Sequence, residues 1–191
     1  MPLRISFKLD DADLQHFEEV AQQTQASARE RSAEVVIAAA REVLEAAGRA
    51  QLADFVKERF SRLRLMLSMA TDPDWPIGAE DNQRLINALA CFGGAPAATG
   101  TANVGFLDHA IMIELVSRDL EHDLAAYRDF CNFRDSLLTS RRRPAADQDE
   151  QRQQLLQQRR GLLQDRMHTR RKRTLDAAGS SVRKLFSLFG L

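Results

Sequence analysis

The chain has 191 residues, of which 44% are hydrophobic and 28% are charged, enough for a packed domain with an appendage rather than a disordered chain. Lysine and arginine balance aspartate and glutamate, so the net charge of zero excludes a uniformly basic or acidic protein. The two cysteines, Cys91 and Cys131, form no Cys-x-x-Cys pair, and we expect two buried thiols rather than a disulfide.

Apolar residues at spacings of three and four predict helices along most of the chain. We expect a first helix from about residue 10 to 25, and a second that begins at Ser27 or Ser32 and ends near residue 47. A third is predicted over about 50–70, where the amphipathic period is clearest. Each would bury one apolar side against its neighbours.

A proline-containing break follows the third helix. The stretch Asp-Pro-Asp-Trp-Pro at 72–76 contains two prolines, which restrict the residues before them to extended conformations. We expect Trp75 to pack over the helix ends, because tryptophan is usually largely buried. A fourth helix is predicted over about 80–92. The segment 93–105 has no basic residue and neither phosphate-binding glycine pattern, so we interpret it as a connector.

The longest helix is predicted from about Phe106 to Leu138. Its apolar residues step by three or four without interruption, which is typical of the central helix of a bundle. They are Phe106, Ala110, Ile113, Val116, Leu120, Leu124, Tyr127 and Cys131.

The C-terminal part changes character. A helix over about 147–173 is rich in glutamine and arginine, and its few leucines recur near a spacing of seven, which predicts a narrow two-helix seam. The sequence therefore predicts an all-α protein, with a helical bundle of about five helices over residues 1–140. A charged helical arm and an amphipathic tail follow over 141–191.

Charge divides the chain in the same place. Residues 1–140 carry 14 Lys/Arg and 22 Asp/Glu, whereas residues 141–191 carry 13 and 5. The two parts should attract each other, within one chain or between chains, unless the basic part contacts another anionic surface. The candidate residues for such a contact are Arg159, Arg160, Arg166, Arg170, Arg171, Lys172 and Arg173.

The expected partners of the arm and tail remain open at this point. The arginine cluster suits backbone phosphates of nucleic acid, or is a solvated face that offsets the acidic domain. In the tail, four apolar residues fall on one helical face, which suits an anionic membrane surface, the protein's own helices or a second subunit. These four are Val182, Leu185, Phe186 and Phe189.

The segment GFLDHAIMIELVSRDL at 105–120 resembles the signature of the YkvA-like family, a bacterial domain of unknown function. The resemblance implies an all-helical domain with no established activity, and it covers most of the chain, loosely at the N-terminus. Family members usually carry acidic residues in the preceding loop and a second acid where this chain has His109, so we expect a divergent member. The signature positions are Gly105, Phe106, Leu107, Asp108, His109 and Glu114.

No catalytic constellation emerges from the residues. Three Asp-x-x-His pairs, at 13/16, 119/122 and 165/168, would point both groups one way on a helix, as in di-metal bundles, but their contexts favour chance pairing. We assign no catalytic residue, metal or cofactor, and expect a non-catalytic interaction protein. Without a signal-peptide core or an apolar run of about 18 residues, we expect a cytoplasmic protein, or one at the periphery of the inner membrane.

Overall fold

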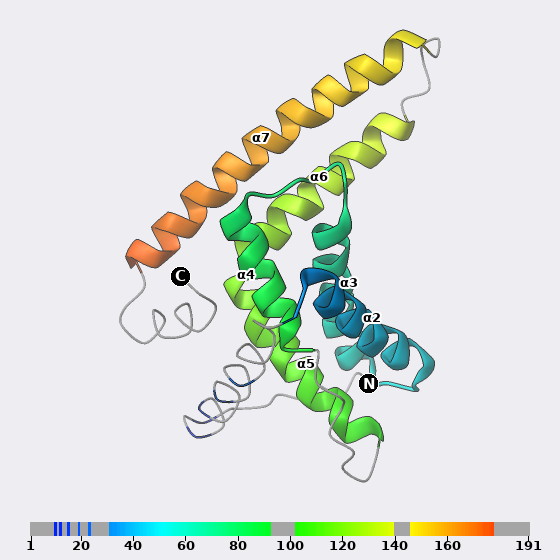
Figure 1. Cartoon of the computed structure of the whole chain (residues 1–191), viewed down its shortest axis with the longest axis vertical. Coiled ribbons are helices and arrows are strands. Elements are labelled where there is room, and N and C mark those ends of the chain that lie inside the picture. The colour runs from blue at the N-terminus through cyan, green and yellow to red at the C-terminus, as the bar shows by residue number, and fades with distance from the viewer. Residues whose placement is uncertain are drawn as a thin grey trace, which may run out of the picture.

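The computed structural model describes residues 31–92, 102–139 and 146–177, together with Asp10, Ala12, Gln15, Glu19 and Gln23. These described residues are helical apart from short connections (Figure 1). The helices are α2 (Ala33–Arg49), α3 (Asp54–Thr71), α4 (Ala79–Ala90), α5 (Ala102–Asp119), α6 (Glu121–Thr139) and α7 (Ala146–Ala177). The predicted all-α bundle is confirmed. Within the described residues no helix combines the length and the apolar character needed to cross a membrane.

The helices bury the apolar sides that the periodicity predicts. In α2 the buried residues recur every three or four positions, as Val36, Ala40, Val43 and Ala47. α3 packs against α2, α4, α5 and α6, so the bundle is assembled around it. Its Phe60 ring meets the Phe106 ring of α5 edge to face, with the centroids 5.8 Å apart.

The expected continuous helix over 106–138 is wrong. It is two helices, α5 and α6, which meet at a turn at Leu120 and run in different directions (Figure 1). The Asp119 carbonyl there accepts a hydrogen bond from Arg84 Nη2 at 3.2 Å, which satisfies a backbone group at the end of α5. The apolar stripe still faces inward on both sides of the turn, and Val116, Leu120 and Leu124 are all buried.

The arm forms an antiparallel hairpin with α6. His122, near the start of α6, lies 2.8 Å from the Thr174 hydroxyl near the end of α7, while Arg159 stacks over Phe133 further along α6. The hairpin extends beyond the other described helices at its far end (Figure 1). Its seam buries two leucines that are seven residues apart, as the sequence predicts, and Met167 one turn later. Leu156 and Leu163 are 6% and 2% exposed.

The cysteines differ from expectation. Neither forms a disulfide, but both are half-buried rather than buried. Cys91 follows the last turn of α4, and its thiol donates to the Asn87 carbonyl at 3.8 Å. Cys131 lies midway along α6, where Arg134 Nη2 donates to its sulfur at 3.9 Å. Both positions are margins of the core, where polar groups reach the sulfur.

The first predicted helix falls mostly outside the described residues. Four of its positions are described as helical and exposed: Ala12, Gln15, Glu19 and Gln23. The amide of Gln15 donates to Glu19 Oε1 at 3.2 Å, one turn further along. The apolar positions Leu14, Phe17 and Ala21 lie outside the described residues, so that part of the expectation stays a prediction.

Adjacent leucines on α7 test the docking of this helix. Leu163→Ala should lower the free energy of unfolding by about 2–5 kcal/mol, because it removes a buried side chain and leaves a cavity. Leu162→Ala is the matched control. Its side chain is 64% exposed, so the change should stay within about 0.5 kcal/mol. Urea unfolding of both variants measures the difference, and equal losses would mean that α7 is not packed as described.

Candidate functional site

The basic residues predicted on the arm divide into two groups. Arg159, Arg160 and Arg171 are half-buried and contact the bundle. The Arg159 guanidinium lies 5.4 Å from the centroid of the Phe133 ring. Arg160 donates to the Asp74 carbonyl at 3.1 Å, and Arg171 Nη1 lies 2.6 Å from Asp81 Oδ1. Part of the basic character of α7 is therefore used to hold the helix in place.

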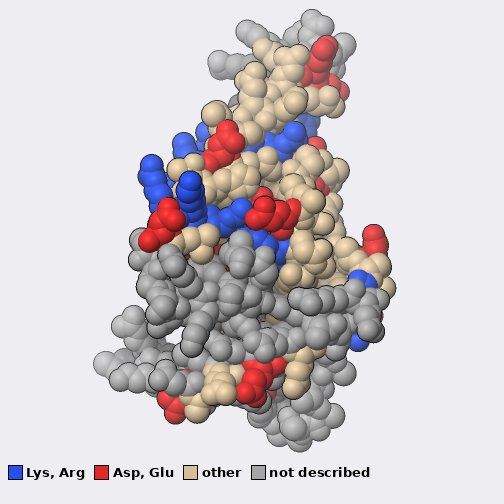
Figure 2. Space-filling model, turned by 60° about the vertical axis from the view of Figure 1, so that its left-hand side comes forward, with Lys and Arg blue, Asp and Glu red and all other residues tan. Residues whose placement is uncertain are grey.

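The other four basic residues face solvent. Arg166, Arg170, Lys172 and Arg173 are all exposed, in the C-terminal half of α7. Figure 2 turns forward the side of the molecule on which α7 lies in Figure 1, and shows Lys and Arg side chains projecting beside several Asp and Glu. These exposed cations form the candidate surface for an anionic partner.

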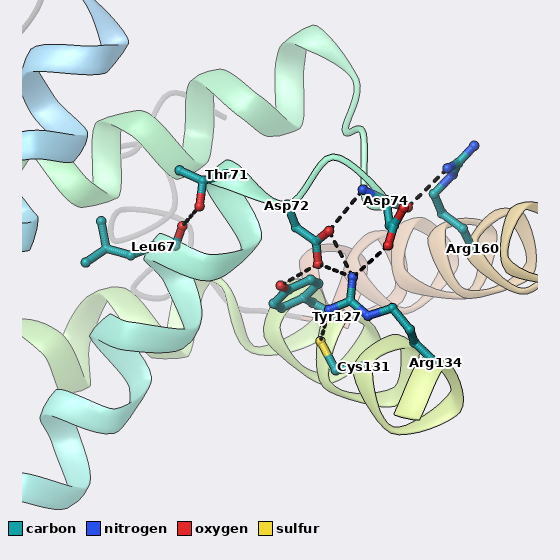
Figure 3. Close-up of polar contacts among 8 residues, drawn as sticks. All are labelled: Leu67, Thr71, Asp72, Asp74, Tyr127, Cys131, Arg134 and Arg160. Carbon is teal, nitrogen blue, oxygen red and sulfur yellow. Dashed lines mark hydrogen bonds and ion pairs between the residues drawn. The ribbon is translucent and has the colours of Figure 1, made fainter. Parts of the chain in front are cut away.

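Asp72 organises the loop on which the middle of α7 rests (Figure 3). Its carboxylate accepts a hydrogen bond from the Tyr127 hydroxyl at 2.8 Å, and both oxygens accept from Arg134 Nη1, at 3.0 and 2.8 Å. The backbone N–H of Asp74 also donates to Asp72 Oδ1, at 2.9 Å. One carboxylate thus joins the end of α3 to two side chains of α6.

The loop also meets α7 and the aromatic core. Besides Arg160 at the Asp74 carbonyl, Gln164 Nε2 donates to the Pro76 carbonyl at 2.9 Å. Trp75 is 1% exposed, so its expected burial is confirmed, but its ring packs against the middle of α6 rather than over helix ends, with its centroid 4.9 Å from that of Phe130. The loop therefore works as a spacer that is bonded to α6 on one side and to α7 on the other.

Tyr127 and Arg134 keep their protons in this cluster. Burial raises the pKa of the Tyr127 phenol, and its hydrogen bond to Asp72 raises it further, so the hydroxyl stays a donor. Burial works to lower the pKa of Arg134, but the hydrogen bond and charge of Asp72 outweigh it and leave the pKa raised. The Arg134 guanidinium therefore stays charged beside the Asp72 carboxylate.

A second polar cluster lies inside the bundle around Arg84. This residue of α4 is 2% exposed, and its Nη1 lies 3.3 Å from Asp123 Oδ1 of α6. Asp81, one turn earlier on α4, accepts from Arg171 and lies 2.7 Å from His168 Nε2, both on α7. Arg171 also lies 3.5 Å from Asp123. Three helices are thus joined by alternating buried charges.

Burial strongly affects the acids of this cluster. It raises the pKa of Asp123 despite the attraction of Arg84 and Arg171, and it raises the pKa of Asp119 to about 7 despite Arg84. Burial opposes ionisation of Asp81 too, but hydrogen bonds from His168 and Arg171 outweigh it, so the pKa of Asp81 is lowered. Burial lowers the pKa of Arg84, mainly against the attraction of Asp123.

The Arg84 cluster has a structural role and offers no metal-binding geometry. Among residues 31–92, 102–139 and 146–177 and the separately described positions, no group of three His, Cys, Asp or Glu side chains is placed to hold a metal ion. His168 bonds Asp81 rather than lying free beside Asp165, and His122 bonds Thr174. His16, with its partner Asp13, lies outside the described residues.

The residues of the segment that resembles the YkvA-like signature lie on α5. Phe106 is buried, Leu107 and His109 are half-buried, Asp108 is exposed, and Gly105 lies near the start of the helix. His109 stacks on Phe92, with the ring centroids 6.3 Å apart. Glu114 Oε2 lies 2.8 Å from Arg62 and 3.3 Å from Arg59, both on α3. The signature therefore includes a packing face of α5 and an ion pair between helices.

The apolar tail residues predicted to contact a membrane or a partner all lie outside the described residues. They are Val182, Leu185, Phe186 and Phe189. The membrane expectation that depends on them stays a prediction.

Comparison with known proteins finds no matching family model, curated protein or solved structure. The resemblance to the YkvA-like family therefore stays a prediction from the sequence.

The importance of Asp72 can be tested against its neighbour. Asp72→Ala removes an acceptor shared by Tyr127 and Arg134, and should lower the free energy of unfolding by about 2–4 kcal/mol. Asp74→Ala is the control, because that side chain is 48% exposed and its backbone contacts survive, so the loss should stay below about 1 kcal/mol. Thermal and urea unfolding measure both. A smaller loss for Asp72→Ala than for Asp74→Ala would contradict the central role of Asp72.

Asp119 should make stability depend on pH. Because its folded pKa of about 7 lies above the ordinary value, the folded protein keeps a proton that the unfolded chain releases. Its contribution to the free energy of unfolding falls as pH rises from about 4 to 7, by up to about 1.4 kcal/mol per unit. Asp119→Asn removes this term, so the variant should gain stability relative to the parent between pH 5 and pH 8. Urea unfolding of both proteins at the two pH values measures this. A difference that does not change with pH would rule it out.

Proposed function

We propose that this protein is a non-catalytic helical interaction protein that contacts an anionic partner through the exposed basic residues of α7. The observation that carries the proposal is the division of α7 into two sides. Arg160 and Arg171 bind the bundle, whereas Arg166, Arg170 and Arg173 face solvent in the C-terminal half of the helix. The exposed arginines therefore make none of the described contacts that hold α7 on the bundle.

The geometry of α7 supports a binding role for this side. Arg166, Arg170 and Arg173 are spaced by four and three, so they share one side of the helix. The buried Leu163 and Met167 hold the helix against the bundle, so the cations are displayed on a fixed support. A preorganised surface loses less conformational entropy when a partner binds.

Further support comes from the sequence resemblance, which implies a helical domain with no established activity, here as a divergent member of the YkvA-like family. A cytoplasmic location belongs to the same proposal. The alternatives keep the basic C-terminal part but change the partner. One is nucleic acid held by the same arginines, and the other is a membrane surface held by the tail beyond residue 177. Each alternative predicts binding to a different anionic probe.

A charge-reversal variant tests the proposal. Arg166→Glu/Arg170→Glu/Arg173→Glu should weaken binding to immobilised poly-glutamate at low salt by about tenfold or more, because it replaces attraction by repulsion. The matched control, Arg41→Glu/Arg118→Glu/Arg128→Glu, changes the net charge equally at exposed positions on α2, α5 and α6. It should weaken binding much less.

The same proteins are compared on duplex DNA and on vesicles that contain anionic lipid. Stronger α7-dependent binding to DNA would favour the nucleic-acid alternative, and vesicle binding that ignores the α7 arginines would favour the tail. If the two triple variants weaken binding equally on every probe, only net charge matters and the proposed contact surface is wrong.

A further inference from the structure

Two leucines of α7 face away from the bundle. Leu155 is 39% exposed and Leu162 is 64% exposed, although the next residues, Leu156 and Leu163, are buried. Because they are seven residues apart, the exposed leucines lie on the same side of the helix, about 10 Å apart along its axis. Apolar residues seven apart are typical of a contact between two helices. No helix of the described residues covers this pair.

Arginines run beside the leucines at the same interval. They occupy positions 152, 159, 166 and 173, each seven residues after the last. Arg159 is turned toward Phe133, whereas Arg166 and Arg173 are exposed. Between residues 152 and 173 the helix holds eight Lys/Arg and a single acid, Asp165. Arg159, Arg160 and Arg171 contact the bundle, so the solvent-facing part of α7 combines the two leucines with four exposed cations, Arg166, Arg170, Lys172 and Arg173.

We propose that this side of α7 binds an acidic amphipathic helix of a partner protein. The inference rests on the proposed function and adds the chemistry of the partner. Its apolar residues, also about seven apart, would pack against Leu155 and Leu162. Its carboxylates would lie beside Arg166 and Arg173, where opposite charges stabilise the pair and set its register.

Charge argues against a second copy of this chain as the occupant. A second α7 would bring the same excess of cations to the contact, and a parallel copy in register would set each arginine of the flank against its own counterpart. Like charges so placed are destabilising. The exposed leucines argue against nucleic acid and against a membrane surface as the occupant. Backbone phosphates make no use of exposed leucines, and two apolar side chains give a membrane surface little to hold.

Because α7 is already docked on the bundle, its solvent-facing side is preorganised for binding. A helix that must fold on binding loses conformational entropy at that moment. Here α7 is already fixed by Leu163 and Met167 in the seam and by the contacts of Arg160 and Arg171. The leucines and arginines are therefore presented in register before the partner arrives.

A pair of designed peptides tests the inference on the full-length chain. The first is a helix of about 21 residues with leucines every seven positions and glutamates on the flanks. The second has the same composition in scrambled order, so its charge is equal but it has no apolar strip. Fluorescence anisotropy of the labelled peptides gives both affinities, and we expect the patterned peptide to bind about tenfold or more tightly than the scrambled one.

Two uncharged variants assign the difference to the leucines. Leu155→Ala/Leu162→Ala should remove the preference for the patterned peptide while keeping the weaker, salt-sensitive binding of the scrambled one. Val35→Ala is the control, because Val35 is 51% exposed on α2, and it should keep the preference. Circular dichroism verifies that the variants remain folded.

The outcomes separate this inference from the proposed function. Equal binding of the two peptides would overturn the docking of a helix, while loss of both in Arg166→Glu/Arg170→Glu/Arg173→Glu would keep the anionic contact. Peptide binding that this variant leaves unchanged would overturn both. Light scattering that shows a dimer abolished by Leu155→Ala/Leu162→Ala would assign the side to a second copy, and vesicle binding abolished in the same way would assign it to a membrane. Either result would refute the proposal.

Discussion

The buried guanidinium of Arg84 is the group on which the arrangement of the helices depends. It pairs with Asp123 of α6 and donates to the Asp119 carbonyl where α5 ends, so it joins α4 to the turn between these two helices. Asp81, one turn before Arg84, forms an ion pair with Arg171 of α7. A guanidinium so deeply buried is tolerated only because anionic and carbonyl groups surround it, which requires all of these helices to be in place.

Much of the fold could be predicted from the sequence because one-sided apolar periods run through each helix. The period cannot reveal the turn at Leu120, since the stripe continues through Val116, Leu120 and Leu124 without a gap. What marks the end of α5 is a contact with Arg84, 35 residues earlier in the chain. Local patterning reports which side of a helix is buried, whereas a change of direction depends on groups brought together by folding.

The candidate surface could be predicted only as a set of basic residues. Which of them bind the bundle depends on the Asp72–Pro76 loop and on Asp81, whose positions follow from packing. A signal for the Arg84 cluster was nevertheless present. Asp81, Arg84 and Asp123 occupy positions on the inward stripes of their helices, next to Leu85 and Leu124. Charged residues at apolar positions on two helices indicate a buried ion pair.

The single tryptophan of the chain gives the α7 contact an optical consequence. Trp75 is enclosed by Tyr127 and Phe130, with ring centroids 5.7 and 4.9 Å away, in a loop whose carbonyls are bonded by Arg160 and Gln164. Its indole is therefore shielded from water within a loop that α7 holds by two hydrogen bonds. Release of α7 would remove both of these bonds from the loop, so the wavelength of tryptophan emission is an intrinsic probe of whether the arm is attached.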